Sequence, residues 1–202
     1  MTAALSLQDI QPGFADPVYD AQRIFRRLMD AMARPGRIVD IDADIVPPVP
    51  GLEGLSAIAL TLLDFETPVY LPRGEIGEAL SGWLRFHCGC PVTTDPQEAV
   101  FAILSVTELL PISAFNSGDP KYPDRSTTLL LACPALEGGK HVSLTGPGIK
   151  EAAHIAPSGI PDSFWNEVMG DRSQFQLGVD IIMGTSNAVI GLPRTTRINE
   201  ES

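Results

Sequence analysis

The sequence predicts an α/β protein in which a mixed central sheet is covered on both faces, that is, a three-layer sandwich. Helical patterns dominate the first half of the chain, whereas short apolar runs typical of buried strands recur in the second half. The composition is that of a globular protein, because 44% of the 202 residues are hydrophobic and 19% are charged. No internal repeat or long linker is visible, so we expect a single domain over residues 1–202.

Residues 17–33 form the clearest predicted helix. Asp16 can cap its first turn and Pro17 suits the first helical position. Arg-Pro-Gly at 34–36 ends the helix, because proline removes a donor and disfavours helical geometry before it. Apolar residues at spacings of three and four predict the side that faces the core: Val18, Ala21, Phe25, Leu28 and Met32.

The elements that follow alternate between strands and helices. Residues 37–45 alternate isoleucine or alanine with aspartate, which predicts a half-buried strand. Helical patterns at 55–64 and 75–87 flank a short strand at 68–71, and a later helix is expected at 161–175. Continuous apolar runs predict five further strands, at residues 100–106, 127–132, 141–145, 179–183 and 188–192.

The charge balance excludes several classes of partner. The formal net charge is −11, and eleven arginines are scattered beside three lysines, so neither a nucleic acid nor an anionic membrane surface is expected as a partner. The first fourteen residues lack the basic and apolar regions of a signal peptide, and the longest apolar stretches are too short to cross a membrane. Three cysteines, an odd number, favour reduced thiols and a cytoplasmic location.

The segment 85–91 gathers one histidine and two cysteines, which with Cys133 or His141 are the residue types of a zinc site. The spacing does not match the paired ligand clusters of structural zinc sites, so a buried helix cap and turn is the favoured interpretation and we expect no metal. Arg85 and His87 remain candidates for binding an anion.

The segment 144–150, Leu-Thr-Gly-Pro-Gly-Ile-Lys, follows a predicted strand. Gly146 and Gly148 would let backbone amides approach an anion, so both are candidate ligand-binding residues. A Walker loop needs four residues between its glycines, whereas here there is one, which favours an ordinary tight turn.

The segment 191–197 lies at the end of the last predicted strand. Two arginines there, Arg194 and Arg197, are candidates for binding phosphoryl or carboxylate oxygens, because arginine offers two parallel donors. The hydroxyl groups of Thr195 and Thr196 are candidates for the same role. An interface patch explains the same residues equally well, and both interpretations stay open.

Two further segments resemble known functional motifs, a calcium loop and a nucleophile elbow, but neither matches in full. One alternative function remains open. The aspartates of 37–45 lack the later glycine and glutamate of a calcium loop. Residues 184–188 nearly match a nucleophile elbow, but the chain has no histidine after them. The alternative is an independent hydrolase in which a cysteine pairs with a distant histidine: Cys88 or Cys90 with His141 or His154.

Seven segments, each weak alone, together resemble one family in their order and separation: 17–22 with 25–29, 31–36, 61–69, 85–87, 144–149, 177–180 and 192–196. The chain resembles PhnH, a subunit family of the carbon–phosphorus lyase machinery. The resemblance covers about 14–197, which we expect to be the ordered core of the single domain.

The resemblance implies a cytoplasmic, homodimeric protein of bacterial phosphonate catabolism that works with PhnG, PhnI, PhnJ and PhnL. That machinery joins methylphosphonate to the ribose of ATP, forming ribose 1-methylphosphonate 5-triphosphate and releasing adenine. The resemblance also implies a fold like the large domain of pyridoxal-phosphate-dependent transferases, without the cofactor. The residues agree, since Lys121, Lys140 and Lys150 occupy loop-like sequence unsuited to a Schiff base. We therefore expect a supporting subunit that is inactive alone.

Overall fold

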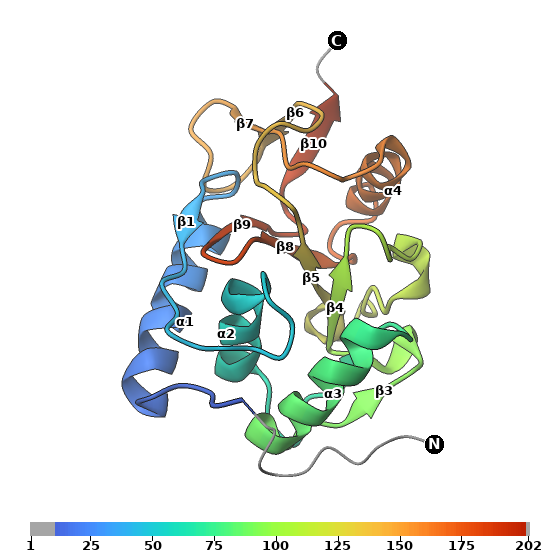
Figure 1. Ribbon diagram of the computed structural model, residues 1–202. Helices are drawn as coiled ribbons and strands as arrows, with labels where there is room; N and C mark the ends of the chain where they lie inside the picture. Colours follow the sequence, from blue (N-terminus) through green and yellow to red (C-terminus); the bar gives the residue numbers. More distant parts are fainter. Residues whose placement is uncertain (1–10, 201–202) are drawn as a thin grey trace.

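The computed structural model describes residues 11–200, and Figure 1 shows their arrangement. Most of the segment from which the lack of a signal peptide was predicted lies outside the described residues. Among the described residues, no helix combines the length and apolar character needed to cross a membrane. The four α-helices of this part of the chain are α1 (Pro17–Ala33), α2 (Glu53–Leu62), α3 (Glu75–Cys88) and α4 (Asp162–Arg172).

Within residues 11–200, ten strands form two sheets. The larger sheet has the order β1-β9-β8-β5-β4-β2-β3, and the smaller one has the order β10-β6-β7. The strands of the larger sheet are β1 (Val39–Asp40), β2 (Val69–Tyr70), β3 (Val92–Thr93), β4 (Phe101–Ser105), β5 (Thr128–Ala132), β8 (Asp180–Gly184) and β9 (Ala188–Leu192). Those of the smaller sheet are β6 (Val142–Thr145), β7 (Ala153–Ile155) and β10 (Arg197–Glu200).

The larger sheet is mixed, which confirms the predicted α/β class. From β3 to β8 all neighbouring strands are parallel, whereas β9 is antiparallel to β8 and to β1. The smaller sheet is antiparallel throughout. Parallel strands need crossover connections, which explains why helices and long loops separate β2, β4, β5 and β8 along the chain.

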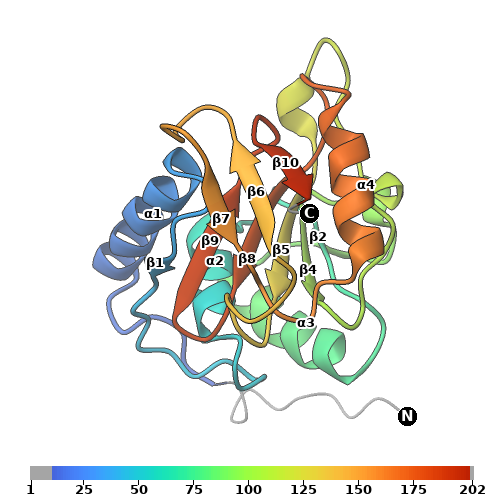
Figure 2. The same cartoon turned by 90° about the horizontal axis from the view of Figure 1, so that it is seen from above.

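Both faces of the larger sheet are covered by apolar side chains, because successive strand residues point to opposite faces. Leu130 of β5 packs in the core beneath α1, α2 and α3. Its neighbours Leu129 and Leu131 pack in a second core, together with α4 and the smaller sheet. In Figure 2 β10 lies between β6 and α4, so the smaller sheet and α4 together form one layer.

The strand predicted at 37–45 is mostly wrong. Only Val39 and Asp40 pair with β9, and one further backbone bond joins Ile41 N to the Asn187 carbonyl at 2.7 Å. Ile41 and Ile45 are nevertheless buried, as their alternation predicted. Alternating burial therefore occurs here in extended chain that lacks a neighbouring strand. The smaller sheet was only partly anticipated, because β7 and β10 are short and carry little apolar pattern.

The predicted buried side of α1 is also wrong in part. Leu28 is buried as expected, but Val18 and Phe25 are 76% and 46% exposed, and Ile24 and Ala31 face the core instead. The reason is close packing on β9. A Cβ at Gly191 would lie 2.8 Å from the Ala31 carbonyl, so the small side of α1 approaches the sheet. A second apolar stripe is left facing outwards.

Candidate functional site

A pocket of about 690 Å³ lies where the turn after β6, the end of α4 and the connection from β9 to β10 meet. Three arginines line it, Arg172, Arg194 and Arg197, and we call it the arginine pocket. Thr145, Ser173 and Thr195 line the same pocket. The three segments are far apart in sequence, and the pairing of β10 with β6 brings them together. Guanidinium and hydroxyl groups in one hollow are typical of a site for an oxyanion.

Arg172 is the last residue of α4 and its side chain is only 4% exposed. Its Nη1 donates to the Val179 carbonyl at 2.6 Å and to Asp171 Oδ2 at 3.1 Å, and its Nη2 donates to the Leu192 carbonyl at 3.3 Å. These bonds tie α4 to the start of β8 and the end of β9. The Nε of Arg172 is buried and has no hydrogen-bond partner among the described residues.

Arg194 follows β9 and is held at two points. Its Nη2 donates to Asp180 Oδ2 at 2.7 Å, and its Nη1 donates to the Pro123 carbonyl. The backbone N–H of Arg194 also donates to Asp180 Oδ1 at 2.7 Å. Asp180 therefore fixes both the main chain and the guanidinium, so Arg194 enters the pocket wall in a set position.

The turn at Gly146 closes against the connection that carries Thr195. Gly146 has a φ of 136°, and a Cβ on it would lie 2.9 Å from the Thr195 carbonyl. Only glycine accommodates both the backbone angle and this close approach. Gly146 thus allows the main chain of the turn to form a wall of the pocket.

Burial and charge act together at the arginine pocket. Burial lowers the pKa of Arg172, and the negative charge of Asp171 partly opposes this. Burial likewise raises the pKa of Asp171, while the charge of Arg172 and the bond from the Val179 N–H oppose the change. With Asp171 beside Arg172 and Asp180 beside Arg194, Arg197 is the one arginine of the pocket without an ion pair to a described residue, so these five groups have a formal charge of about +1.

Gly148 lies elsewhere, against the end of α1. A Cβ on Gly148 would lie 2.2 Å from the Ala33 carbonyl, and Gly148 lines a separate open hollow of about 460 Å³. That hollow also has Arg34, Arg37 and Lys150 along its wall. Both arginines pair with Asp30, so this basic hollow is more weakly charged than its composition predicts.

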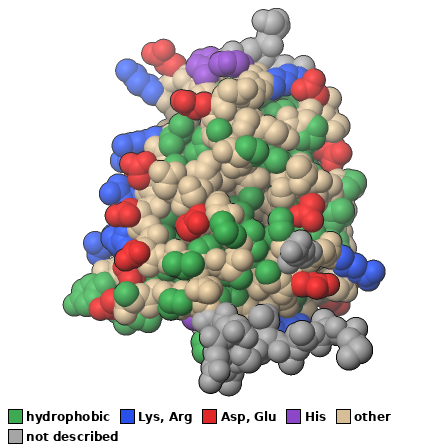
Figure 3. Space-filling model, viewed as in Figure 1, with side chains coloured by type: hydrophobic (Ala, Val, Ile, Leu, Met, Phe, Trp, Pro, Cys, Tyr) green, Lys and Arg blue, Asp and Glu red, His purple; other side chains and the backbone are tan. Residues whose placement is uncertain are grey.

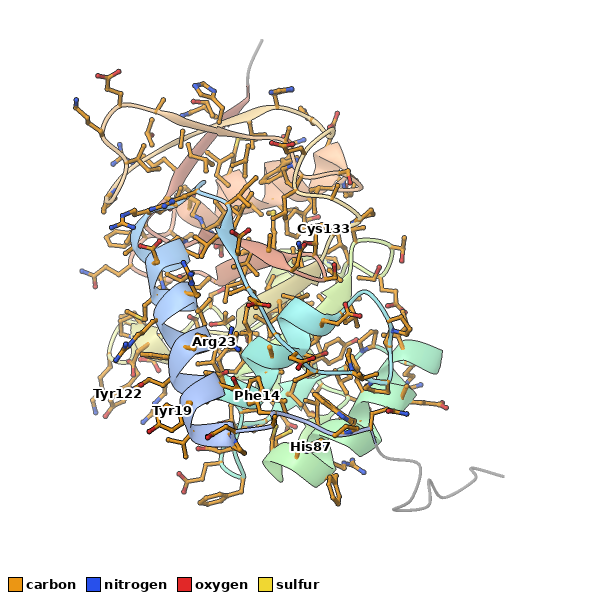
Figure 4. The ribbon with its side chains drawn as sticks, turned by 60° about the vertical axis from the view of Figure 1, so that its left-hand side comes forward. Phe14, Tyr19, Arg23, His87, Tyr122 and Cys133 are labelled. Carbon is orange, nitrogen blue, oxygen red and sulfur yellow. The ribbon has the colours of Figure 1, made fainter. Side chains whose placement is uncertain are left out.

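Arg85 and His87 lie at the end of α3, and the six sequence-predicted ligand residues do not form one site. His87 Nε2 lies 3.0 Å from the Gln11 carbonyl, which also accepts from Trp83 Nε1 at 2.9 Å. The His87 and Trp83 rings are 4.8 Å apart. Figure 4 shows His87 low on the molecule near Phe14, in the region where this N-terminal segment crosses α3. His87 therefore helps to hold the N-terminal segment around Gln11 against α3.

The cysteines form a helix end, as the favoured interpretation predicted. Gly89 is a left-handed C-cap with φ 67°, and Cys90 is buried. A hydrogen bond between the two thiols raises the pKa of Cys88 and lowers that of Cys90. Cys133 lies far from His87 in Figure 4, and the described residues contain no cluster of three or more potential metal ligands.

The alternative hydrolase is contradicted by the position of the sheet. Cys88 and Cys90 pack on the side of α1, α2 and α3, whereas His141 and His154 line a hollow beside the smaller sheet, on the opposite face. A cysteine and a histidine separated by a sheet cannot exchange a proton directly. Cys90 is moreover too buried to meet a substrate.

A second pocket, of about 240 Å³, lies at the carboxyl ends of β4 and β5, where α/β proteins commonly bind ligands. Ser105, Thr107 and Cys133 are among its lining residues, and the rest of its wall is largely apolar. Burial raises the pKa of Cys133 to about 12, so this thiol is not a nucleophile at neutral pH. The arginine pocket therefore groups more charged and hydroxyl-bearing side chains than this second pocket does.

Sequence reasoning identified Gly146, Arg194, Thr195 and Arg197 but missed Arg172. Arg172 sits in a helix with little amphipathic character. The strand that Arg197 opens was not predicted either. No local signal marks Arg172, because its long-range hydrogen bonds go to the main-chain carbonyls of Val179 and Leu192.

Comparison with known proteins identifies relatives of nearly the whole chain. A family model described as bacterial phosphonate metabolism protein (PhnH) matches residues 12–199. The subunit PhnH of the alpha-D-ribose 1-methylphosphonate 5-triphosphate synthase of Rhizobium meliloti (strain 1021) is 42% identical over 189 residues, which are 93% of this chain and 94% of that protein. HtxG of Stutzerimonas stutzeri, provisionally named a C-P lyase subunit protein, is 31% identical over 179 residues, 88% of this chain and 85% of that protein.

Proposed function

Because the chain belongs to the PhnH family of bacterial phosphonate metabolism proteins, we propose that it is a subunit of the synthase that makes ribose 1-methylphosphonate 5-triphosphate from ATP and methylphosphonate. The observation that carries this proposal is the 42% identity to a subunit of that synthase across 93% of the chain. The related C-P lyase subunit protein of Stutzerimonas stutzeri supports the same assignment. We place the assembly in the cytoplasm, in keeping with the reduced cysteines expected there.

The role proposed for this chain is to support the assembly, with catalysis residing in the complex. The arginine pocket holds two arginines, Arg172 and Arg194, that are already paired with carboxylates, and the thiols of the chain are buried or without a facing histidine. Such a chain can contribute binding and positioning, whereas displacement of adenine needs an activated nucleophile.

A dimer through α1 is part of the proposal. Its outward stripe exposes Val18, Phe25 and Met29 at spacings of seven and four, which places them on one helical face. Acidic residues flank the start of the helix and arginines its later turns, and mixed charges line this edge in Figure 3. An antiparallel pair of α1 helices from two copies would bury the stripe and bring opposite charges together, as a two-fold interface requires.

We also infer kinship with the large domain of pyridoxal-phosphate-dependent transferases, with no pyridoxal bound. The doubly covered mixed sheet supports this fold relationship. The lysines support the lack of the cofactor, because Lys121 and Lys150 are exposed and Lys140 forms an ion pair with Asp162 at 3.2 Å. A buried amine that could hold a Schiff base is thus not among them.

Co-expression with PhnG, PhnI and PhnJ tests the proposal. We expect this chain to co-purify with the other subunits in fixed stoichiometry. The complex should release adenine from ATP when methylphosphonate is present. The matched control is the same preparation without this chain, which should lose the activity. Failure to co-purify would refute membership of the assembly, and turnover by the isolated chain would refute the supporting role.

A further inference from the structure

The arginine pocket has features that its structural bonds do not explain. Arg172 is a buried cation whose Nε lacks a partner among the described residues, although burying an unpaired donor is costly. Arg197 lines the same pocket, is exposed and forms no ion pair with a described residue. The uncommitted cation of Arg197, beside two arginines that are held in place by carboxylates and carbonyls, leaves the pocket with a positive charge that no described residue pairs with.

The charge count limits the class of ligand. Arg172 and Arg194 are balanced by Asp171 and Asp180, so the pocket offers about one net positive charge together with neutral donors. A single phosphoryl or phosphonyl group, with up to two negative charges, is matched by one cation and several hydrogen bonds. A triphosphate would carry about four charges and would meet the two aspartates and an overall charge of −11.

The shape of the pocket limits the ligand further. Its volume of about 690 Å³ greatly exceeds what one phosphoryl group fills. Phe175 lines the pocket with its side chain 58% exposed, and Pro147 adds another apolar surface. An organic substituent attached to the phosphorus group would therefore lie against Phe175, while the hydroxyl groups of Thr145, Ser173 and Thr195 complete the polar wall.

We infer that the arginine pocket binds an organic ligand with a single phosphoryl or phosphonyl group, held by Arg197 and covered by Phe175. This inference goes beyond the proposed function, which requires no small molecule to bind this subunit. It is tested on the isolated chain, so its failure is distinct from failure of the assembly.

The test is titration calorimetry with four probes: inorganic phosphate, methylphosphonate, phenyl phosphate and tripolyphosphate. Phenyl phosphate should bind more tightly than phosphate, and Phe175→Ala should remove that advantage. Arg197→Gln should weaken all binding about tenfold or more, since a charge-assisted hydrogen bond is lost. Arg197 is exposed, so the variant should keep the wild-type melting temperature.

Lys150→Gln is the matched control, because it removes an exposed cation from the separate basic hollow beside Gly148. Its affinity should equal that of the wild type. Absence of binding by every probe, or a greater loss in Lys150→Gln than in Arg197→Gln, would overturn the site. Tighter binding of tripolyphosphate than of phenyl phosphate would overturn the assignment to a single phosphorus group. A fifth probe, methyl phosphate, carries the same substituent as methylphosphonate, so comparing these two distinguishes phosphate esters from phosphonates as the preferred class.

Discussion

Replacing Gly148 by alanine should lower the free energy of unfolding more than the same change at Gly138, a glycine with the same φ angle. Gly148 and Gly138 both have φ of +83°, so alanine at either position costs about 1–2 kcal/mol for the left-handed backbone. At Gly138 nothing lies within 4 Å of the added Cβ. At Gly148 the new Cβ would meet the Ala33 carbonyl at 2.2 Å and Pro35 Cδ at 3.0 Å.

The difference between the two variants isolates the contact. The turn carrying Gly148 must move by about 0.8 Å before its new Cβ stands 3.0 Å from the carbonyl, and such overpacking costs about 1–3 kcal/mol. We therefore expect Gly148→Ala to lose about 2–5 kcal/mol of unfolding free energy and Gly138→Ala about 1–2 kcal/mol. Urea unfolding with linear extrapolation measures both losses. Equal losses would show that the turn moves freely and would refute the argument for close packing.

Three further predictions address the site, the thiols and the dimer. Asp180→Ala should lower the free energy of unfolding, measured in urea, by about 2–4 kcal/mol, because it leaves the mostly buried Arg194 without its carboxylate. Asp42→Ala removes an exposed partner of Arg23 and should lower it by less than about 0.5 kcal/mol. Equal losses in the two variants would contradict this prediction. Burial raises the pKa of Cys133 from 9.0 to about 12. Cys133 should therefore stay unmodified by iodoacetamide at pH 8 in the folded protein, as mass spectrometry can verify. The contribution of its protonated thiol to the free energy of unfolding is complete below pH 9 and is lost as the pH rises towards 12. Phe25→Glu should halve the mass measured by light scattering without lowering the melting temperature, while Val100→Glu, an exposed control on another surface, should leave the mass unchanged.

The sequence predicted helices and buried strands well where one physical signal dominates. The helix at 17–33 has a cap, a first-turn proline and a proline stop, and its bounds are confirmed exactly as predicted. The strand at 188–192 is confirmed in the same way, because a fully apolar run suits a sheet covered on both faces. The side of this helix that faces the core was predicted wrongly, because the helix has two apolar stripes. The packing against Gly191, which the sequence pattern does not show, determines which stripe is buried.

The loop residues of the candidate site could be predicted from the sequence, whereas the residues that hold the loops in place could not. Arg194 and Thr195 follow a strand in a segment rich in donors, which marked them in the sequence. Arg172 was not marked, because its role depends on carbonyl groups from β8 and β9 that no local pattern reveals. Long-range hydrogen bonds of this kind depend on topology, so single-sequence reasoning cannot place them.

Three of the seven segments that resemble the PhnH family, 144–149, 177–180 and 192–196, meet around the arginine pocket or support it. Segment 192–196 supplies Arg194, and segment 177–180 supplies the aspartate that holds it. Segment 144–149 packs one glycine against the Thr195 carbonyl and the other against the carbonyl that ends α1, which belongs to segment 31–36. Segments 144–149, 177–180 and 192–196 are far apart in sequence, and the pairing of β10 with β6 and the hydrogen bonds of Asp180 to Arg194 bring them together at one polar corner of the molecule. This corner is therefore built by long-range contacts, which is why its composition could be predicted from the sequence while its geometry could not.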